Sequence, residues 1–541
     1  MRDSRSTTER LPAGTTRSPS SQLSRAPGGA APRALTSSLL LGCALAALSC
    51  SSEGAYAPSA DPVAPRPAPS STVPAAAPER SVVPVAPQPS LVPLAPTSQD
   101  DEGLGDVSLE MLDEPATAVP PSRVTVVVLE PPGRPAVDCA PLDNPGALDD
   151  ADINVDLSTQ FQRISGFGGM NQPRWIADLT PEQALVAFGD APGQLGLSLL
   201  RMAISANPED FILEVPTAQR AVALGARVFA TPWTPPPSLK SNASNIGGEL
   251  PPENYGAYAD HLLAFRNVLA ENGVPLTAIS VQNEPDISVN YDSCDWTAAQ
   301  IGDFLKEQGP RFGDTRLIAA ESFNFNRMLT DPLLNDAAAA AEFEIVGGHI
   351  YGRGLADYPL ARERGKEVWM TEHYTDSGAE PDRANLWPLA FNVATELQRS
   401  MQANFNAYVW WYIRRGYGLI TDDGLVSKRG YLMSQFSRFI RPGYVRVAAS
   451  NPALEGVDVT AYSNGPDSVV VVVLNTTDVA QTVALDLFGS CVVGFDRFTT
   501  SQVKNAQNDG PVALIGGRVS VTLDPRSVTS FVSQPIVAAA N

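Results

Sequence analysis

Eight short apolar runs, each followed by a polar loop and then by a helix-like stretch, constrain the fold of the central part of this chain. The runs are rich in β-branched residues and almost continuously apolar, as strands covered on both faces are. Strands that alternate with helices in this way predict a (β/α)8 barrel, which we place at residues 166–440. The eight runs are Ile164–Gly169, Leu197–Ile204, Val228–Trp233, Ala278–Gln282, Leu317–Ala320, Ile345–Ile350, Val368–Thr371 and Tyr408–Tyr412.

The pattern changes after Tyr444, where short strands alternate with turn residues and helical stretches are lacking. This pattern predicts a β-sandwich side domain at residues 441–541. A further strand within residues 146–165 is expected to join it. The fold class is therefore α/β, a (β/α)8 TIM barrel with an attached antiparallel β-sandwich side domain. The strands expected after the barrel are Val457–Ser463, Ser468–Asn475, Thr482–Phe488, Val519–Asp524 and Ser527–Ser533.

The first residues have the layout of an export signal. Residues 1–33 contain six arginines and two acidic residues, and an apolar run too short to span a bilayer follows. This predicts a signal peptide at residues 1–49. The run ends Ala47-Leu48-Ser49-Cys50, which resembles a bacterial lipobox with an acylated Cys50, although an ordinary cleavage site is the alternative. We expect a secreted protein or a cell-surface or outer-membrane lipoprotein of a bacterium, held at a membrane only through this anchor.

A proline-rich segment separates the signal from the barrel. Residues 51–100 contain twelve prolines among many Ala, Ser and Val residues. Proline removes backbone donors and favours extended polyproline II over helices and sheets. Residues 50–145 are therefore interpreted as a disordered tether.

Charge and cysteine content argue against several classes of partner and against a bound metal or cofactor. The 541-residue chain has 59 acidic against 38 basic residues, a net charge of −21, which disfavours nucleic acid and anionic membrane surfaces. It has three histidines and no Cys-x-x-Cys pair, so we expect no metal and no cofactor. Cys139 and Cys491 are candidates for a disulfide, which leaves Cys294 unpaired. We expect a monomer.

Two glutamates stand where predicted strands end, in Ser280-Val-Gln-Asn-Glu284 and Val368-Trp-Met-Thr-Glu372. Catalytic residues of (β/α)8 enzymes lie at the C-terminal ends of strands. A glutamate is more often a solvated acid, but burial beside an apolar strand perturbs its pKa. Two carboxylates together can protonate a leaving oxygen and attack a sugar carbon, so the pair predicts glycosidic bond cleavage.

Six motifs in order strengthen this interpretation, and they resemble glycoside hydrolase family 30, above all its subfamily 8, the bacterial glucuronoxylanases. The resemblance covers the chain from Ile164 through the β domain. It implies a retaining endo-β-1,4-xylanase that hydrolyses glucuronoxylan. The motifs are Gly166-Phe-Gly-Gly-Met-Asn171, Ala230-Thr-Pro-Trp233, Val281-Gln-Asn-Glu-Pro-Asp286, Trp369-Met-Thr-Glu372, Val409-Trp-Trp-Tyr-Ile-Arg-Arg415 and Ser427-Lys-Arg-Gly-Tyr431.

The resemblance implies roles for individual residues. Glu284 would be the general acid/base and Glu372 the nucleophile. Asn283 would hold the substrate 2-hydroxyl, Tyr351 would hydrogen-bond Glu372, and Arg201 would lie beneath the nucleophile.

Aromatic residues and histidines also lie near these strand ends. Trp233 and Trp411 would stack on sugar rings, and core filling is the alternative for both. His349 is expected to border the pocket. Side chains alternate along a strand, so His373 is expected to pack away from Glu372.

The subfamily pattern also implies a site for a glucuronic acid branch. Arg415, the second arginine after the last barrel run, would bind the uronate carboxylate through two charge-assisted hydrogen bonds. The alternative is that Arg414 and Arg415 both form structural salt bridges. The residues expected to support Arg415 are Tyr374, Ser377, Tyr412 and Tyr417.

The chain departs from the subfamily pattern at two places, the loop 287–296 after Asp286 and Gly416. The loop borders the expected cleft, so contacts near the cleavage point can differ. Two other functions stay open: a family relative acting on unbranched xylan or another β-glycan, and a non-catalytic surface glycan-binding lipoprotein. The second would be expected to lack Glu284 or Glu372.

Overall fold

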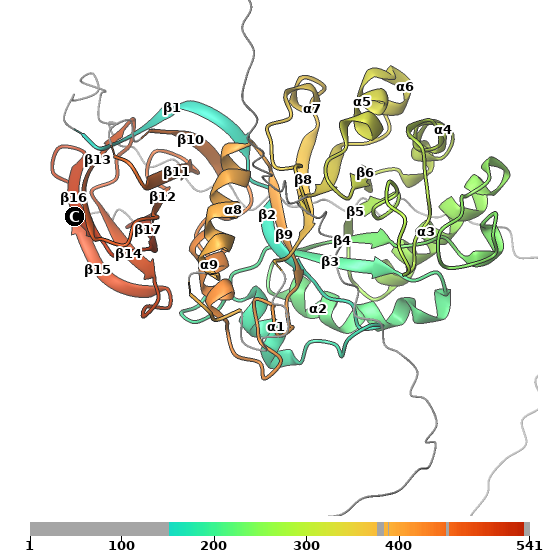
Figure 1. Ribbon diagram of the computed structural model, residues 1–541, viewed down its shortest axis with the longest axis horizontal. Helices are drawn as coiled ribbons and strands as arrows, with labels where there is room; N and C mark the ends of the chain where they lie inside the picture. The colour runs from blue at the N-terminus through green and yellow to red at the C-terminus, as the bar shows by residue number, and fades with distance from the viewer. Residues whose placement is uncertain (1–150, 376–383, 388, 451–453, 535–541) are drawn as a thin grey trace, which may run out of the picture. The chain divides into compact units, whose positions relative to one another are not determined.

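The computed structural model describes residues 151–375, 384–387, 389–450 and 454–534. Within these ranges the chain forms a closed parallel barrel and a nine-stranded sheet (Figure 1). No helix in the described part is long and apolar enough to cross a membrane. The predicted signal peptide, Cys50, the tether, Cys139 and Ser377 lie outside the described residues.

The barrel closes in sequence order, each strand parallel to its neighbours, and this confirms the predicted fold. The eight predicted runs match its strands and differ from them only at the ends. The strands are β2 Gly166–Met170, β3 Leu199–Ile204, β4 Arg227–Pro232, β5 Leu276–Ser280, β6 Arg316–Ser322, β7 Ile345–His349, β8 Glu367–His373 and β9 Ala407–Tyr412.

Large and small side chains fill the inside of the barrel. Phe229 and Trp369 meet edge to face with ring centroids 5.5 Å apart, and Ile318 and Val409 are fully buried beside them. Strands β2 and β3 can approach closely because residue 168 is a glycine. A Cβ atom at Gly168 would lie 2.3 Å from the carbonyl oxygen of Leu199. The interior is thus a packed core, and the ends of the strands are left to carry chemistry.

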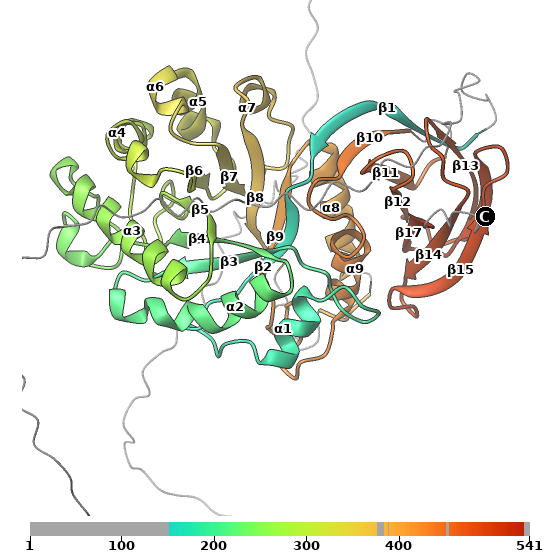
Figure 2. The ribbon, with the colours of Figure 1, turned by 180° about the vertical axis from the view of Figure 1, so that it is seen from behind.

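Helices cover the outside of the barrel, and Figure 2 shows them from the reverse side. Thr180 and Thr297 each begin a helix with a capping box that satisfies the first free backbone N–H groups. The α-helices are α1 Pro181–Phe188, α2 Val215–Ala223, α3 Tyr255–Glu271, α4 Ala298–Gln308, α5 Arg327–Asn335, α6 Ala337–Ala340, α7 Pro359–Glu363, α8 Phe391–Gln402 and α9 Lys428–Ser437. Short 3-10 turns are η1 Pro208–Glu214, η2 Pro237–Leu239, η3 Pro252–Asn254 and η4 Gly309–Phe312.

The second sheet runs in the order β15-β14-β17-β12-β11-β10-β1-β13-β16. It is antiparallel throughout except where β1 and β13 pair in parallel. The expected side domain is confirmed, but β10, β14 and β15 were not among the predicted strands. The strands are β1 Ile153–Arg163, β10 Val445–Ser450, β11 Val457–Ser463, β12 Val469–Asn475, β13 Gln481–Phe488, β14 Gly494–Thr500, β15 Gln507–Ala513, β16 Arg518–Leu523 and β17 Ser527–Ser533.

Polar contacts join the barrel helices α8 and α9 to this sheet. The Thr460 hydroxyl donates to Oε1 of Gln398 over 2.9 Å, and the Ser530 hydroxyl donates to the carbonyl oxygen of Gln435 over 2.8 Å. These bonds are buried, so each replaces a lost contact with water. Of the cysteines in the described part, Cys294 is buried and free, and Cys491 is disulfide-bonded.

Candidate active site

Glu284 and Glu372 meet at the C-terminal ends of the barrel strands. Glu372 belongs to β8, and Glu284 follows β5 with its backbone N–H donating to the carbonyl oxygen of Glu321 over 3.0 Å. Glu284 and Glu321 have φ angles of 43° and 33°, in the left-handed region that non-glycine residues rarely adopt. Such backbone strain is typical of functional sites, where surrounding structure holds it in place.

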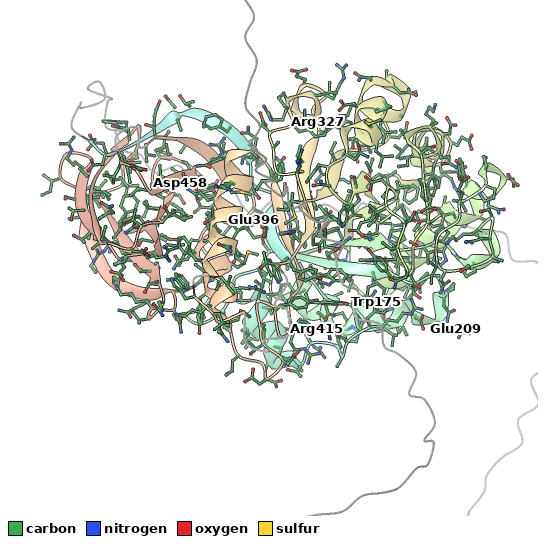
Figure 3. The ribbon with its side chains drawn as sticks, viewed as in Figure 1. Trp175, Glu209, Arg327, Glu396, Arg415 and Asp458 are labelled. Atoms are coloured by element: carbon green, nitrogen blue, oxygen red, sulfur yellow. The ribbon has the colours of Figure 1, made fainter. Side chains whose placement is uncertain are left out.

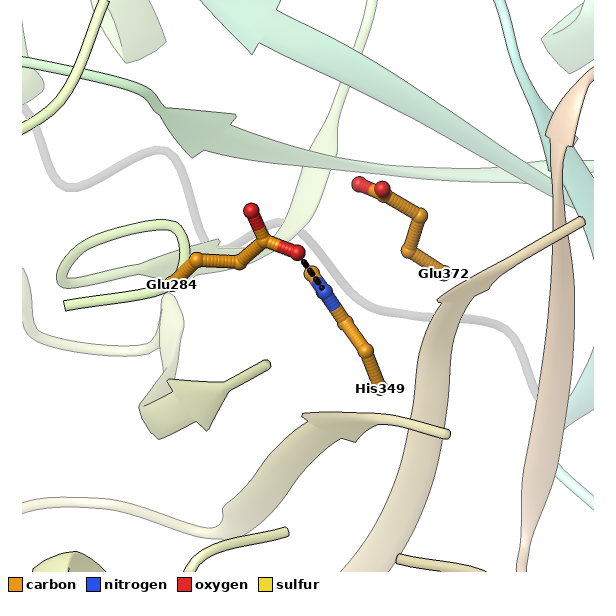
Figure 4. A group of neighbouring side chains, drawn as sticks. All are labelled: Glu284, His349 and Glu372. Atoms are coloured by element: carbon orange, nitrogen blue, oxygen red, sulfur yellow. Dashed lines mark hydrogen bonds and ion pairs between the residues drawn. The ribbon is translucent and has the colours of Figure 1, made fainter. Parts of the chain in front are cut away.

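The two carboxylates point into the same space, and His349 contacts Glu284 (Figure 4). One oxygen of each carboxylate and one ring nitrogen of His349 lie within 4.8 Å of one another. Glu284 is 4% exposed and Glu372 is 6% exposed. Retaining glycosidases hold their carboxyl groups roughly 5–5.5 Å apart, whereas inverting enzymes need about 6.5–9.5 Å. The spacing therefore fits direct attack on the sugar.

Hydrogen-bond donors surround Glu372. Its Oε2 accepts from the Arg201 guanidinium, and its Oε1 accepts from the Tyr351 hydroxyl over 2.9 Å. Burial alone would lower the pKa of Arg201, but the carboxylates of Glu321 and Glu372 raise it, so the guanidinium stays charged. The cation and the hydroxyl together fix the orientation of this carboxylate.

Glu284 has a different environment. His349 Nδ1 lies 2.8 Å from its Oε1, and the Tyr291 hydroxyl donates to its Oε2 over 2.7 Å. Burial raises the pKa of Glu284, while its hydrogen bonds with His349 and Tyr291 oppose that rise. A carboxyl group with a raised pKa opposite an oriented carboxylate is the division expected for an acid and a nucleophile.

His349 is fully buried at the end of β7. Burial would lower its pKa, but the charges of Glu372 and Glu284 and the contact with Glu321 raise it to about 9. Glu284, His349 and Glu372 are also close enough to hold a metal ion. Metal binding needs a neutral imidazole, whereas the surrounding carboxylates raise the pKa of His349 and Arg201 already pairs with Glu372. We therefore interpret the group as a carboxylate pair with a histidinium.

A third buried carboxylate, Glu321 at the end of β6, was not predicted. Its Oε1 accepts from Nη2 of Arg201 over 3.1 Å and from the Thr231 hydroxyl over 3.3 Å, and Nε2 of His349 lies 3.8 Å away. Burial would raise its pKa, but Arg201 and His349 hold the pKa at about 2. The signal for it was present in the sequence, because Glu321 directly follows the apolar run Leu317–Ala320.

Two further predicted residues lie at the same strand ends. Asn283 accepts a hydrogen bond from Nη2 of Arg201 through its Oδ1 over 2.7 Å. His373 packs as expected, because its Nδ1 lies 2.7 Å from Oε1 of Glu396, away from Glu372. Its ring lies 4.9 Å from that of Tyr351 and so packs against the tyrosine that contacts Glu372.

Aromatic rings form a wall beside the carboxylates. Trp233 and Trp411 have centroids 5.7 Å apart, and Trp175 packs edge to face on Trp233 at 5.4 Å. The Arg201 guanidinium lies 4.7 Å from the Trp233 centroid. Trp233 is 5% exposed, whereas Trp175 and Trp411 are half-buried, so the last two offer ring surface to a sugar. Trp175 and Tyr291, which packs on the same wall, were missed by sequence reasoning.

A second cluster surrounds Arg415, which Figure 3 labels. The Arg415 guanidinium lies 5.6 Å from the Tyr412 ring centroid, and it opposes the rise that burial causes in the pKa of Tyr417. Tyr417 stacks on Tyr374 at 4.6 Å, and Tyr374 meets Tyr351 edge to face at 5.8 Å. Neighbouring rings thus connect Tyr351, which contacts Glu372, to Arg415.

Arg414 points elsewhere. Its guanidinium donates to the carbonyl oxygen of Ala177, in the loop that follows β2. Of the two neighbouring arginines, Arg414 therefore connects two loops of the barrel, and Arg415 lies in the aromatic cluster.

A buried, closely spaced carboxylate pair at the strand ends of a (β/α)8 barrel defines a retaining glycoside hydrolase. Comparison with known families agrees: residues 196–409 match the Glycosyl hydrolase family 30 TIM-barrel domain, and residues 443–531 match the family 30 beta sandwich domain. The chain belongs to glycoside hydrolase family 30, a family of retaining enzymes.

Relatives with solved structures or curated functions cover the same region. The glucuronoxylanase XynC of Bacillus subtilis is 40% identical over 400 residues, which are 72% of this chain and 94% of that protein. The subfamily 8 xylanase Xyn30A of Clostridium acetobutylicum is 36% identical, with a TM-score of 0.65 over 71% of this chain and 100% of the other. A family 30 endoxylanase of Clostridium papyrosolvens is 34% identical, with a TM-score of 0.64, and the match covers 71% of this chain and 100% of the other.

Proposed function

We propose that this enzyme is an endo-β-1,4-xylanase that hydrolyses glucuronoxylan and recognises a glucuronic acid branch through Arg415. Its similarity to the Bacillus glucuronoxylanase and to the two Clostridium xylanases supports the substrate class. The proposal does not depend on similarity alone, because the residues around Arg415 suit an anionic sugar.

The observation that carries the proposal is the position of Arg415. Its guanidinium lies among Tyr374, Tyr412 and Tyr417, and this cluster adjoins Tyr351, whose hydroxyl contacts the nucleophile. The planar guanidinium can donate two parallel hydrogen bonds to a carboxylate, and tyrosine rings and hydroxyls suit a sugar. A local cation of this kind also allows an acidic protein to bind an acidic branch.

In the first step, Oε of Glu372 attacks the anomeric carbon of a xylose residue. The bond from that carbon to the leaving xylose oxygen breaks, and Glu284 gives its proton to this oxygen. The result is a covalent glycosyl ester of Glu372, with Glu284 as an anion. Asn283, whose Oδ1 is fixed by Arg201, holds the 2-hydroxyl, and Arg201 also orients Glu372.

In the second step, the Glu284 anion takes a proton from water while the water oxygen attacks the same carbon. The ester bond breaks, Glu372 is released as a carboxylate, and Glu284 has its proton again. Two displacements retain the configuration at the anomeric carbon.

The test compares initial rates and products on methylglucuronoxylan and on debranched linear xylan. Fast hydrolysis of the branched polymer alone, giving oligomers that each keep one uronate at a fixed place, supports the proposal. Equal rates on both polymers would contradict the uronate requirement and favour an enzyme for unbranched xylan. Cleavage of neither would point to another β-glycan.

We also propose that the enzyme is exported and anchored through an acylated Cys50. The arginine-rich start, the short apolar run and the sequence Ala47-Leu48-Ser49-Cys50 support this. Mass spectrometry of the mature N-terminus tests it. A diacylglyceryl group on Cys50 is the expected result, and an unmodified cysteine would contradict anchoring.

A further inference from the structure

Three acidic and two basic side chains share the desolvated space around the ends of the barrel strands. Glu284, Glu321, Glu372, Arg201 and His349 are each 6% exposed or less. Burial makes an uncompensated charge costly, so such a cluster favours protonation states that balance. With Arg201 and His349 cationic and with Glu321 and Glu372 anionic, the charge is zero when Glu284 carries a proton.

This balance depends on Glu321. The described contacts of its side chain are with other buried side chains of the barrel. Glu321 comes from β6 and is wholly buried. The charged groups facing it are Arg201 from β3 at 3.1 Å and His349 from β7 at 3.8 Å. The other carboxylates of the cluster reach the same two cations, Glu372 through Arg201 and Glu284 through His349.

We propose that Glu321 is a positioning residue that keeps His349 protonated and thereby keeps the transferable proton of Glu284 on Oε2, the oxygen that does not face the ring. The inference rests on the proposed roles of Glu284 and Glu372. Glu321 acts through His349 and does not touch the substrate.

The geometry explains why the charge of His349 matters. Its Nδ1 lies 2.8 Å from Oε1 of Glu284, while Oε2 of Glu284 faces the Tyr291 hydroxyl. A histidinium donates its Nδ1 proton to Oε1, so the acidic proton of Glu284 must sit on Oε2, away from the ring. A neutral ring with a bare Nδ1 would accept that proton through Oε1 and withdraw it from the leaving oxygen.

The other ring nitrogen faces Glu321. Within the described chain, Nε2 of His349 has no hydrogen-bond partner, and Oε1 of Glu321 lies 3.8 Å from it. Three carboxylates favour the positive ring, Glu372 by its charge, Glu284 through Nδ1 and Glu321 through this second nitrogen. Glu321 adds to the other two, since opposite charges at such distances shift a pKa by about 1–3 units. Loss of the anion lowers the pKa of the coupled His349 and Glu284 pair, whichever of the two gives up the proton.

The first test is the isosteric variant Glu321→Gln in the full chain, with the pH dependence of kcat/KM on methylglucuronoxylan. The basic limb of the profile is expected to move to lower pH by at least about one unit. Glu367→Gln is the matched control, because Glu367 begins β8 at the opposite end of the barrel and pairs with Arg316. An unmoved basic limb in Glu321→Gln, or an equal shift in Glu367→Gln, would overturn the proposal.

The second test reads the charge of His349 directly. The chain has three histidines, so nitrogen-15 labelling of histidine gives three ring systems, and His349→Gln identifies the one that is lost. His349 of the wild type is expected to be an imidazolium at pH 7.5, and its titration is expected to begin at lower pH in Glu321→Gln. A neutral His349 in the wild type at pH 7.5 overturns the proposal even if the variant does not fold.

These measurements also distinguish failure of the proposed catalytic roles from failure of the proposed role of Glu321. Full activity after loss of Glu284 or Glu372 would refute the proposed catalytic roles. The charge of His349 measured in the wild type would not be affected by that result. A neutral His349 in an enzyme that depends on both glutamates would refute only the role of Glu321.

Discussion

The hydroxyl of Tyr291 donates a 2.7 Å hydrogen bond to Oε2 of Glu284. This bond stabilises the ionised carboxylate and lowers the pKa of Glu284 against the effect of burial. Tyr291→Phe is therefore expected to raise that pKa and move the basic limb of kcat/KM to higher pH. A hydrogen bond of about 1 kcal/mol corresponds to a little under one pH unit.

The control for this variant is Tyr462→Phe, which removes a buried hydroxyl in the sandwich sheet that bonds to Thr460. Its pH profile is expected to match that of the wild type. A basic limb that stays in place, or moves to lower pH, in Tyr291→Phe would show that this hydroxyl does not act on Glu284.

Glu372→Ala is expected to lower kcat on methylglucuronoxylan by more than about a thousandfold, because no covalent intermediate can form. The space left by the side chain admits a small anion. Added azide is expected to restore turnover and to give a glycosyl azide of inverted configuration, which proton NMR detects. Near wild-type activity in Glu372→Ala would show that another group is the nucleophile.

Arg415→Ala is expected to reduce kcat/KM on glucuronoxylan by roughly 10–100-fold, since loss of a charged partner costs about 1.5–3 kcal/mol. Hydrolysis of debranched xylan is expected to change little. Arg414→Ala is the matched control, because that guanidinium donates to the carbonyl oxygen of Ala177. It is expected to affect both polymers equally. Equal losses on both polymers in Arg415→Ala would remove the uronate role.

Glu214 gives a prediction about stability. It is buried in η1, and burial raises its pKa well above 4.5, with the charge of Asp178 adding to the rise. Above about pH 4.5 the unfolded chain loses this proton while the folded chain keeps it, so the free energy of unfolding falls as pH rises. Glu214→Gln is therefore expected to raise Tm at pH 7 and to have little effect at pH 4.

Differential scanning calorimetry at both values of pH measures this, and Glu209→Gln is the control from the exposed face of the same turn. It is expected to leave Tm unchanged at both values. A Glu214→Gln variant whose Tm change is the same at pH 4 and pH 7 would contradict the linkage.

The barrel could be predicted because its strands are buried on both faces. Runs such as Ile345–Ile350 and Tyr408–Tyr412 are apolar without interruption, and the glutamates that follow β5 or end β8 stand out against them. The sandwich strands were harder. Strand β15, Gln507–Ala513, contains polar residues, Gly510 and Pro511, and is mostly exposed, so no burial pattern marks it.

The site residues that could be predicted are those that directly end or follow an apolar strand. Glu284, Glu372, Asn283 and Tyr351 all lie at strand ends. Tyr291 was not predicted, because it reaches Glu284 from an irregular loop whose path depends on tertiary contacts. Glu321 was visible but not interpreted, because its partners come from β3 and β7, far away in the sequence.

The position of strand β1 determines how late in synthesis the side sheet can form. It precedes the barrel, yet its hydrogen-bonded neighbours β10 and β13 follow it, and Arg163 donates to Gly443, 280 residues later. During synthesis the edge of β1 stays unpaired until almost the whole chain has emerged. Contacts of such long sequence separation form slowly and expose strand edges to aggregation in the meantime. The fold is therefore completed late in synthesis. A chain that stops after the eighth barrel strand leaves β1 without either neighbour.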